Sequence, residues 1–332
     1  MNEQVLRDHY NKRGYSDAKT EEAVTAVREL QSYLEARLSS LKSAGCEEIR
    51  IYITDLIHQE KNTLETLLAL ARYFYLTGRN EIYVYFTSLL GGIGVVESIQ
   101  SRLGALISPG AAQEMIGSVA HPPLGTDPVD FPAFTRALME RLEQSLPQEI
   151  VRTALAGNNH QIPAEAFEED AALYRNSDSV EAFLRAKHAH QVQTLQHHCD
   201  TGTVWFEQII TQEVVDFVAS NQEIQSAVID GNILYTTKIP YDPVRYLSEA
   251  DPVKKRYYAC HCPFVREAIL RNDAPVSGNW CYCSAGFAKY PYEVLLCRPL
   301  RVDVVESVLD GGSACRFAIH LPEEAIKKEP RS

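Results

Sequence analysis

The sequence predicts an α+β protein with a helical N-terminal region, residues 1–220, and a C-terminal α/β module, residues 221–325, that contains an antiparallel sheet and a cysteine-rich metal site. Three observations support this prediction. Apolar residues recur with a helical period through the first two thirds of the chain. After Ser220, runs rich in β-branched residues alternate with turn signals. Six of the eight cysteines lie after residue 259.

The N-terminal region is expected to consist of helices. Thr20 suits a helix cap, and the apolar residues that follow it recur every three or four positions as far as Leu41. Asn62 with Glu65 resembles a capping box for a helix that Gly78 ends. Further helices are expected from Pro132, over residues 147–156, and from Asp178 to about His198. Whether residues 1–220 form one domain or two stays open.

The C-terminal module is expected to alternate strands and turns. Gly231 and Asn232 separate two β-branched runs, which predicts a hairpin. The run 255–260, KRYYAC, is typical of a strand, and Pro263 opens an expected helix. Residues 300–304 and 315–319 predict two antiparallel strands that turn through residues 310–312.

Two Cys-x-Cys pairs, Cys260 with Cys262 and Cys281 with Cys283, predict a thiolate metal site. In an extended strand, residues i and i+2 face the same side with α-carbons about 6.5–7 Å apart. Ligands of one tetrahedral ion need sulfurs about 3.8 Å apart, so each segment must bend. Pro263 would help the first pair to bend.

Four thiolates favour Zn²⁺ and would give a centre with a net charge of about −2. An iron–sulfur cluster and free or redox-active thiols are the alternatives. Four protein ligands are typical of a structural zinc, whereas a catalytic ion needs one open position for water. The sequence leaves this choice open.

Candidate proton-transfer residues are His190, His197 and Asp200, which the helical period brings to the end of one helix. Solvated histidines at a helix C-terminus are the plainer interpretation. Tyr258, Trp280 and Tyr282 are candidate ligand-binding residues, since tyrosine and tryptophan often line small-molecule pockets. Their preference for strands is an equally good explanation.

The formal charge of −12, from 44 acidic and 32 basic residues, disfavours nucleic acid and anionic membranes as partners. The sequence shows no run of about 18 apolar residues and no signal-peptide pattern near its start. We therefore expect a cytoplasmic protein with a small-molecule ligand, which can also form a homo-oligomer. Clustered thiols in a reducing compartment point to metal binding or catalysis.

The stretch from Ser284 to Pro322 resembles the end of the 4-vinyl reductase domain superfamily and of the related aminothiazoline-carboxylate hydrolase-like proteins. The matching positions are Gly311 or Gly312, Cys315, Phe317 and Ile319. The resemblance implies an α/β module that ends in a helix, a strand, a glycine-containing turn and a strand. It also implies binding of small organic molecules, often beside a cysteine-rich zinc site. The period of the last strand places Cys315 among buried residues, where an inert thiol is expected.

These observations favour a zinc-binding protein of sensor or carrier type with a small-molecule pocket. A metal-dependent hydrolase of a small organic substrate is the first alternative, and an interaction scaffold with structural zinc is the second.

Overall fold

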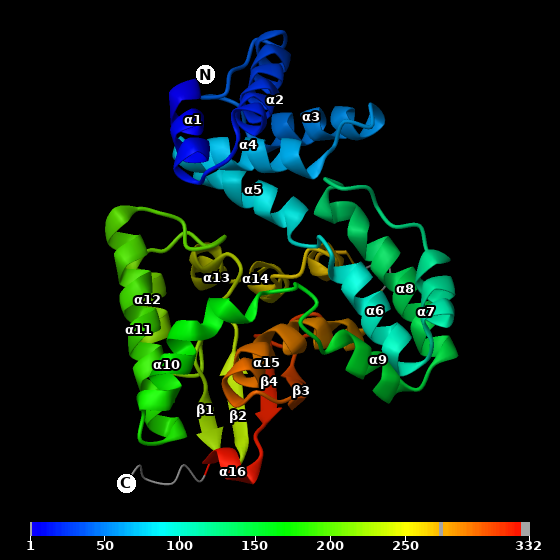
Figure 1. Cartoon of the computed structure of the whole chain (residues 1–332), viewed down its shortest axis with the longest axis vertical. Coiled ribbons are helices and arrows are strands. Elements are labelled where there is room, and N and C mark those ends of the chain that lie inside the picture. The colour runs from blue at the N-terminus through cyan, green and yellow to red at the C-terminus, as the bar shows by residue number, and fades with distance from the viewer. Residues whose placement is uncertain (1, 272–274, 327–332) are drawn as a thin grey trace. The chain divides into compact units, whose positions relative to one another are not determined.

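The computed structural model describes residues 2–271 and 275–326. Over these residues the chain is mostly helical and contains a four-stranded antiparallel sheet, which confirms the predicted α+β class (Figure 1). The chain divides into two compact units. Unit 1 holds the residues up to Gly91 together with His121–Phe131, and unit 2 holds Gly92–Ala120 and the residues from Pro132 onward. The division differs from the predicted boundary at residue 220, because the helices of residues 92–220 pack into the unit that contains the sheet.

Unit 1 is a bundle of helices around one apolar core. Leu30, Ile49 and Phe74, from three different helices, are each fully buried. Its helices are α1 (Glu3–Lys12), α2 (Asp17–Glu35), α3 (Cys46–His58), α4 (Leu64–Leu76) and α5 (Asn80–Leu90).

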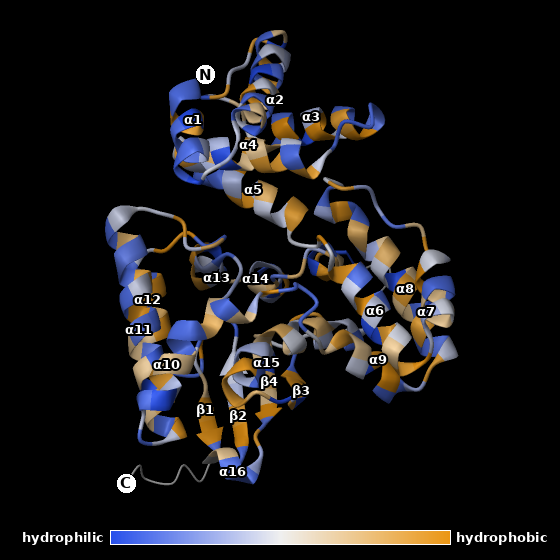
Figure 2. Ribbon diagram, viewed as in Figure 1, coloured by the Kyte–Doolittle hydropathy of each residue, from blue (hydrophilic) through white to orange (hydrophobic). Residues whose placement is uncertain are grey.

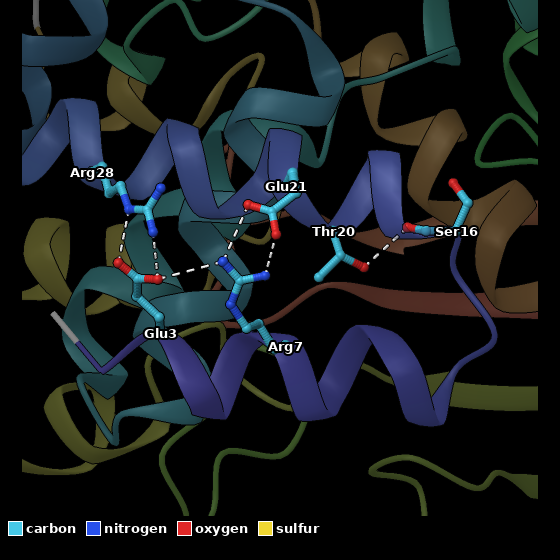
Figure 3. A network of polar contacts seen from close by, with 6 residues as sticks. All are labelled: Glu3, Arg7, Ser16, Thr20, Glu21 and Arg28. Carbon is cyan, nitrogen blue, oxygen red and sulfur yellow. Dashed lines mark hydrogen bonds and ion pairs between the residues drawn. The ribbon is translucent and has the colours of Figure 1, made fainter.

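A network of ion pairs joins α1 to α2 at the surface of unit 1 (Figure 3). The Glu3 carboxylate accepts hydrogen bonds from Arg28 Nε at 2.7 Å and Nη2 at 2.6 Å. Arg7 binds Glu21 and lies 3.5 Å from Glu3. All of these groups are solvent-accessible, so the network orients the two helices and contributes little to stability.

The predicted cap at Thr20 was wrong. Helix α2 begins earlier, where the Ser16 hydroxyl accepts a hydrogen bond from the Lys19 N–H at 3.4 Å. Thr20 is 3% exposed inside the helix and donates its own hydroxyl to the Ser16 carbonyl. Ser16, four residues upstream of Thr20, therefore provides the cap.

Unit 2 surrounds a sheet in the strand order β1-β2-β4-β3, with all neighbours antiparallel. Its strands are β1 (Val228–Asp230), β2 (Ile233–Thr237), β3 (Arg301–Glu306) and β4 (Arg316–His320). The predicted hairpin at residues 231–232 and the two predicted final strands are confirmed. Figure 2 shows the hydrophobic colouring of β1 and β2.

Helices cover one face of this sheet. Helix α15 packs against β3 and β4, and α11 packs against β1. The helices of unit 2 are α6 (Val95–Leu106), α7 (Pro109–Gly117), α8 (Phe131–Ser145), α9 (Gln148–Leu155), α10 (Glu168–Asn176), α11 (Val180–Thr201), α12 (Gln212–Ala219), α13 (Pro243–Ser248), α14 (Pro252–Ala259), α15 (Tyr282–Leu296) and α16 (Glu323–Ile326).

The predicted strand over residues 255–260 was wrong, because most of that run belongs to helix α14. The Asp251 carboxylate caps this helix by accepting hydrogen bonds from the N–H groups of Val253 and Lys254, both at 2.9 Å. Pro252 at the first helical position supports the same start. Capping therefore outweighs the strand preference of Tyr257 and Tyr258. The expected helix after Pro263 shrinks to a short 3₁₀ turn, Arg266–Ile269.

The stretch Asn80–Leu106 is long and apolar enough, by length and composition, to cross a membrane. In the structure it forms two helices, α5 and α6, which residues 91–94 separate. Phe86 and Ile99 are both fully buried. The same pattern is expected for core helices of a globular protein, so the stretch is weak evidence for a membrane span.

Candidate metal centre

Four cysteines of unit 2 form one group of neighbouring thiols. Cys260 follows the end of α14, Cys262 precedes Pro263, Cys281 is the N-cap of α15, and Cys315 directly precedes β4. Each of the four lies near enough to the other three for their charges to interact. We call these four residues the cysteine cluster. All four are free thiols.

Close packing around two glycines brings the segments of the cluster together. A Cβ at Gly92 would lie 2.8 Å from the Phe264 ring, and that ring packs on Trp280 with centroids 5.3 Å apart. A Cβ at Gly278 would lie 2.0 Å from a carboxylate oxygen of Asp310, in the turn between β3 and β4. The segment that carries Cys281 therefore lies directly against this turn.

Hydrogen-bond donors already point to the sulfurs of the cluster. The indole N–H of Trp280, which is 1% exposed, donates to Cys262 Sγ at 3.3 Å. Cys281 Sγ and Ser307 Oγ are 3.0 Å apart. Donors around sulfur stabilise thiolates and so tune a metal held by them.

Without a cation the cluster thiols are neutral. Burial raises the pKa of Cys260, Cys281 and Cys315, and the charge of neighbouring thiolates raises the pKa of all three further. Burial also raises the pKa of Cys262, although the Trp280 N–H opposes this effect. Four such thiols can ionise together only if a cation compensates them.

Cys283 occupies a different position from the one that the sequence predicts. Its pKa is raised to about 12 by burial, and among the described cysteines it interacts only with Cys262. Its sulfur instead accepts a hydrogen bond from Asn159 Nδ2 at 3.7 Å. Cys281 and Cys283 lie in a helical turn, where side chains two residues apart point to nearly opposite sides. They therefore do not converge as a strand would make them.

Cys315 takes the place in the group that we expected for Cys283. It lies on the buried face of β4 with Phe317 and Ile319, as the period predicted. The period predicts burial but no neighbour for Cys315. The register of β2 with β4 identifies the neighbour, because the Lys238 N–H donates to the Cys315 carbonyl at 3.1 Å. Cys315 is thereby held beside the segment that follows β2.

The Lys238 ammonium is one of the cations whose charge reaches this region. Its charge acts on Cys262, Cys283 and Cys315 and lowers their pKa values, against the larger effect of burial. Lys238 Nζ donates to Ser284 Oγ at 3.4 Å, in the first turn of α15. The first turn of a helix also carries a partial positive charge. The surroundings therefore suit a centre with negative charge.

Four thiolate ligands fit a soft metal, but in this structure their sulfurs are not arranged around one ion. Among residues 2–271 and 275–326, no three His, Cys, Asp or Glu side chains are arranged to hold a metal ion. Two basic residues that lie near the cysteines in the sequence differ in position. Lys254 is exposed, whereas Arg266 is 6% exposed and lies 4.1 Å from the Tyr241 ring centroid.

The predicted aromatic ligand-binding residues lie in packed surroundings. Trp280 is 1% and Tyr282 9% exposed, and the Arg152 guanidinium lies 4.9 Å from the Tyr282 ring centroid. Tyr258 is half-buried beside Arg245. A shallow hollow of about 640 Å³ lies on the outer face of the sheet, lined by Val228, Asp230, Ile233, Tyr235, Asp303, Val305, Arg316, Ala318 and His320. Because Cys315 faces the other side of β4, this hollow is not part of the thiol centre.

The predicted proton-transfer residues lie on the exposed surface of α11. His190, His197 and Asp200 are all exposed, and the Asp200 carboxylate accepts a hydrogen bond from Gln196 at 2.8 Å. Within the described part of the chain, none of the three has a hydrogen bond or ion pair to a cluster cysteine. Solvated residues at a helix end describe them best.

Another acid–base pair, which the sequence analysis did not predict, lies closer to the cysteines. His261, between Cys260 and Cys262, binds the Glu207 carboxylate through Nδ1 at 2.9 Å and the Ile239 carbonyl through Nε2 at 2.6 Å. Burial tends to raise the pKa of Glu207, but the hydrogen bond from His261 and nearby cations lower it below its usual value. Only the fold brings residues 207 and 261 together.

His160 lies at the edge of the Phe287 ring, with ring centroids 5.5 Å apart. Neighbouring side chains desolvate the His160 ring although the residue is exposed at the surface. This desolvation and the charge of Lys238 lower the pKa of His160 to about 4, so its imidazole is neutral at neutral pH. A close crossing positions this loop, because a Cβ at Gly286 of α15 would lie 2.4 Å from the Gly157 carbonyl oxygen.

No family model, curated protein or solved structure matches this chain. The helix, strand, turn and strand order that the resemblance implies is present as α15, β3, the turn at Gly311 and β4. Membership of the 4-vinyl reductase superfamily stays a prediction. The fold and site define an α+β protein with a buried group of thiols.

Proposed function

We propose that unit 2 is a small-molecule-binding module of sensor or carrier type, built around a metal centre that Cys260, Cys262, Cys281 and Cys315 hold as thiolates. The observation that carries this proposal is the mutual proximity of these four thiols, which come from three separate segments of unit 2. Free buried cysteines are often inert, but four in one group in a reducing compartment favour metal binding.

Electrostatics supports the same proposal. Four thiolates around a divalent ion carry a net charge of about −2, which a buried site must compensate. The Lys238 ammonium and the N-terminus of α15 both lie beside the thiols, and the Trp280 N–H points at one sulfur. A group of thiols that served only for packing would not need these donors.

Zinc is the metal that the ligand chemistry favours. An iron–sulfur cluster is the second candidate. The four thiols interact with one another, yet no three described ligands are placed around one ion. A cluster spreads its four cysteine ligands over several iron atoms and so accepts a wider arrangement. A zinc centre requires the side chains to move closer together when the ion binds.

The test is metal analysis of protein purified without oxygen, combined with X-ray absorption and visible absorption spectra. We expect bound zinc with four sulfur neighbours or, for the second candidate, iron with inorganic sulfide. Cys281→Ser and Cys315→Ser should lose most of the metal. Cys283→Ser and the exposed Cys297→Ser are matched controls that should keep it. Full metal content in Cys315→Ser would contradict the proposed ligand set, and wild-type protein that binds no metal would contradict the proposal itself.

A metal-dependent hydrolase is the alternative that the Glu207–His261 pair favours. His261 lies between two cluster cysteines, and Glu207 holds one of its ring nitrogens. Such a pair could move a proton near a metal-bound water. X-ray absorption distinguishes the two functions, because a hydrolase needs an oxygen neighbour at the metal. An interaction scaffold with structural zinc predicts four sulfurs and no small-molecule binding. For each function we propose a cytoplasmic location.

A further inference from the structure

The outer face of the sheet has an apolar centre that is accessible to other molecules. Directly paired residues of neighbouring strands point to the same face, so the register places Val228 beside Tyr235 and Tyr235 beside Ala318 on this face. Val305, which is 47% exposed, lines the same hollow. Charged side chains surround this centre. An accessible apolar surface within a charged rim is typical of a protein–protein contact.

Opposite charges lie at the two ends of one row of this face. The row crosses all four strands and consists of Asp230, Ile233, His320 and Arg301. Three strand spacings of about 4.8 Å put its end residues about 14 Å apart. Asp230 and Arg301 are both exposed. Arg301 Nη2 lies 2.9 Å from the Asp303 carboxylate and 3.2 Å from His320, and the guanidinium has further N–H donors for a second carboxylate.

We propose that a second copy of this chain stacks on this face, related to the first by a twofold axis that runs along the strands. Such an axis reverses the order of the strands across the contact and keeps each row opposite itself. Asp230 therefore faces the partner's Arg301, and Arg301 faces the partner's Asp230. The two ends of the row form two identical ion pairs, so the charges of the face are complementary to those of its own copy.

The shapes of the facing side chains are also complementary under this symmetry. In the next row the Tyr235 ring lies opposite the partner's Ala318, so the largest side chain of the apolar centre meets the smallest. The Arg316 guanidinium, 4.6 Å from the centroid of the Tyr235 ring, holds this ring in place. Sheets that stack face to face lie about 10 Å apart, a space that large side chains fill where the opposite residues are small. Charge and shape therefore both favour a second copy as the occupant.

Sedimentation velocity of the full chain across about 1–100 μM tests the inference. We expect the wild type to form a dimer. Asp230→Arg and Arg301→Asp each place like charges opposite one another at both ends of the row, and each should weaken the dimer about tenfold or more. An equimolar mixture of the two variants should dimerise again, because a heterodimer of Asp230→Arg with Arg301→Asp has opposite charges in both pairs. Circular dichroism establishes that each variant is folded.

Val305→Lys tests the apolar centre and should also weaken the dimer. Val253→Lys is the matched control, because Val253 is similarly exposed, at 40%, but lies on α14, and it should leave the dimer unchanged. A wild type that stays monomeric would overturn the inference. So would a dimer that both charge variants leave intact, or a mixture that associates no better than either variant alone. The inference goes beyond the proposed function and does not depend on it, since Cys315 lies on the other side of β4, so its failure would leave the metal centre untouched.

Discussion

The close crossing of α15 over the loop after α9 provides the sharpest test of how unit 2 is held together. A Cβ added at Gly286 would lie 2.4 Å from the Gly157 carbonyl oxygen, 2.5 Å from the Gly157 nitrogen and 2.6 Å from the Ala156 carbonyl carbon. All three are backbone atoms, so no side chain can rotate away. Gly286→Ala must therefore move the helix or the loop by roughly 1 Å to restore van der Waals distances.

The expected magnitude follows from two opposing effects. Overpacking of a rigid contact costs about 1–3 kcal/mol, and contacts with backbone place this substitution at the upper end of that range. Alanine is the better helix former by roughly 0.5–1 kcal/mol. We therefore expect Gly286→Ala to lower the free energy of unfolding of unit 2 by about 2 kcal/mol. The shift should also move Asn159 away from Cys283.

Gly110→Ala is the matched control, because Gly110 is also helical and a Cβ there would meet nothing within 4 Å. It should leave stability unchanged or raise it slightly. Urea unfolding followed by tryptophan fluorescence measures both variants. Trp205 and Trp280 are the two tryptophans of the chain, and both belong to unit 2, so the signal reports this unit. If Gly286→Ala were as stable as Gly110→Ala, the close crossing would not constrain the fold as argued.

Three other measurements test neighbouring features. Lys289→Met should destabilise unit 2 by about 3 kcal/mol, because it leaves the half-buried Glu293 carboxylate without the ammonium 2.6 Å away. Replacing both residues by apolar ones should cost less. Urea unfolding would show the opposite order if the ion pair were unimportant. In metal-free protein, iodoacetamide should modify the exposed Cys297 before the cysteine cluster, because burial raises the pKa of the cluster thiols. Mass spectrometry after a short exposure to the reagent measures the labelling. Equal labelling of Cys297 and the cluster would show that the cluster thiols are accessible. NMR should find that His160 protonates near pH 4. Its pKa in the folded protein lies below the unfolded value of 6.5, so the folded state favours the neutral ring. The contribution of this ring to the free energy of unfolding is therefore complete above pH 6.5 and falls as the pH drops toward 4. His160→Gln should reduce this pH dependence.

The sequence predicts the elements of this fold better than their grouping. Local signals determine the hairpin at residues 231–232, because only a short turn with a glycine joins two β-branched runs there. The division into units depends on which helices pack together, and the helical period carries no information on that choice. Helix α11, for example, packs on β1 although it lies before the predicted boundary at residue 220.

Cysteine spacing alone was similarly insufficient for the site. The prediction treats both Cys-x-Cys pairs as extended, so that all four sulfurs converge. That geometry suits Cys260, whose backbone is extended after α14. It fails for Cys281 and Cys283, since the Ser277 hydroxyl caps a helical turn that begins at Gly278 and continues into α15. In a helix the two side chains diverge.

Cys315 shows why periodicity and register give different kinds of information. Alternation along β4 correctly predicts that this thiol is buried, and from burial alone an inert role follows. The pairing of Thr237 with Arg316 then places residue 315 beside Lys238, near the turn that contacts the Cys281 segment. This pairing joins strands about 80 residues apart in the sequence, a separation at which no local pattern specifies a partner. A thiol that is buried and also next to a cation and three other thiols is a candidate ligand, so the register, and not the cysteine spacing, identifies the fourth member of the cluster.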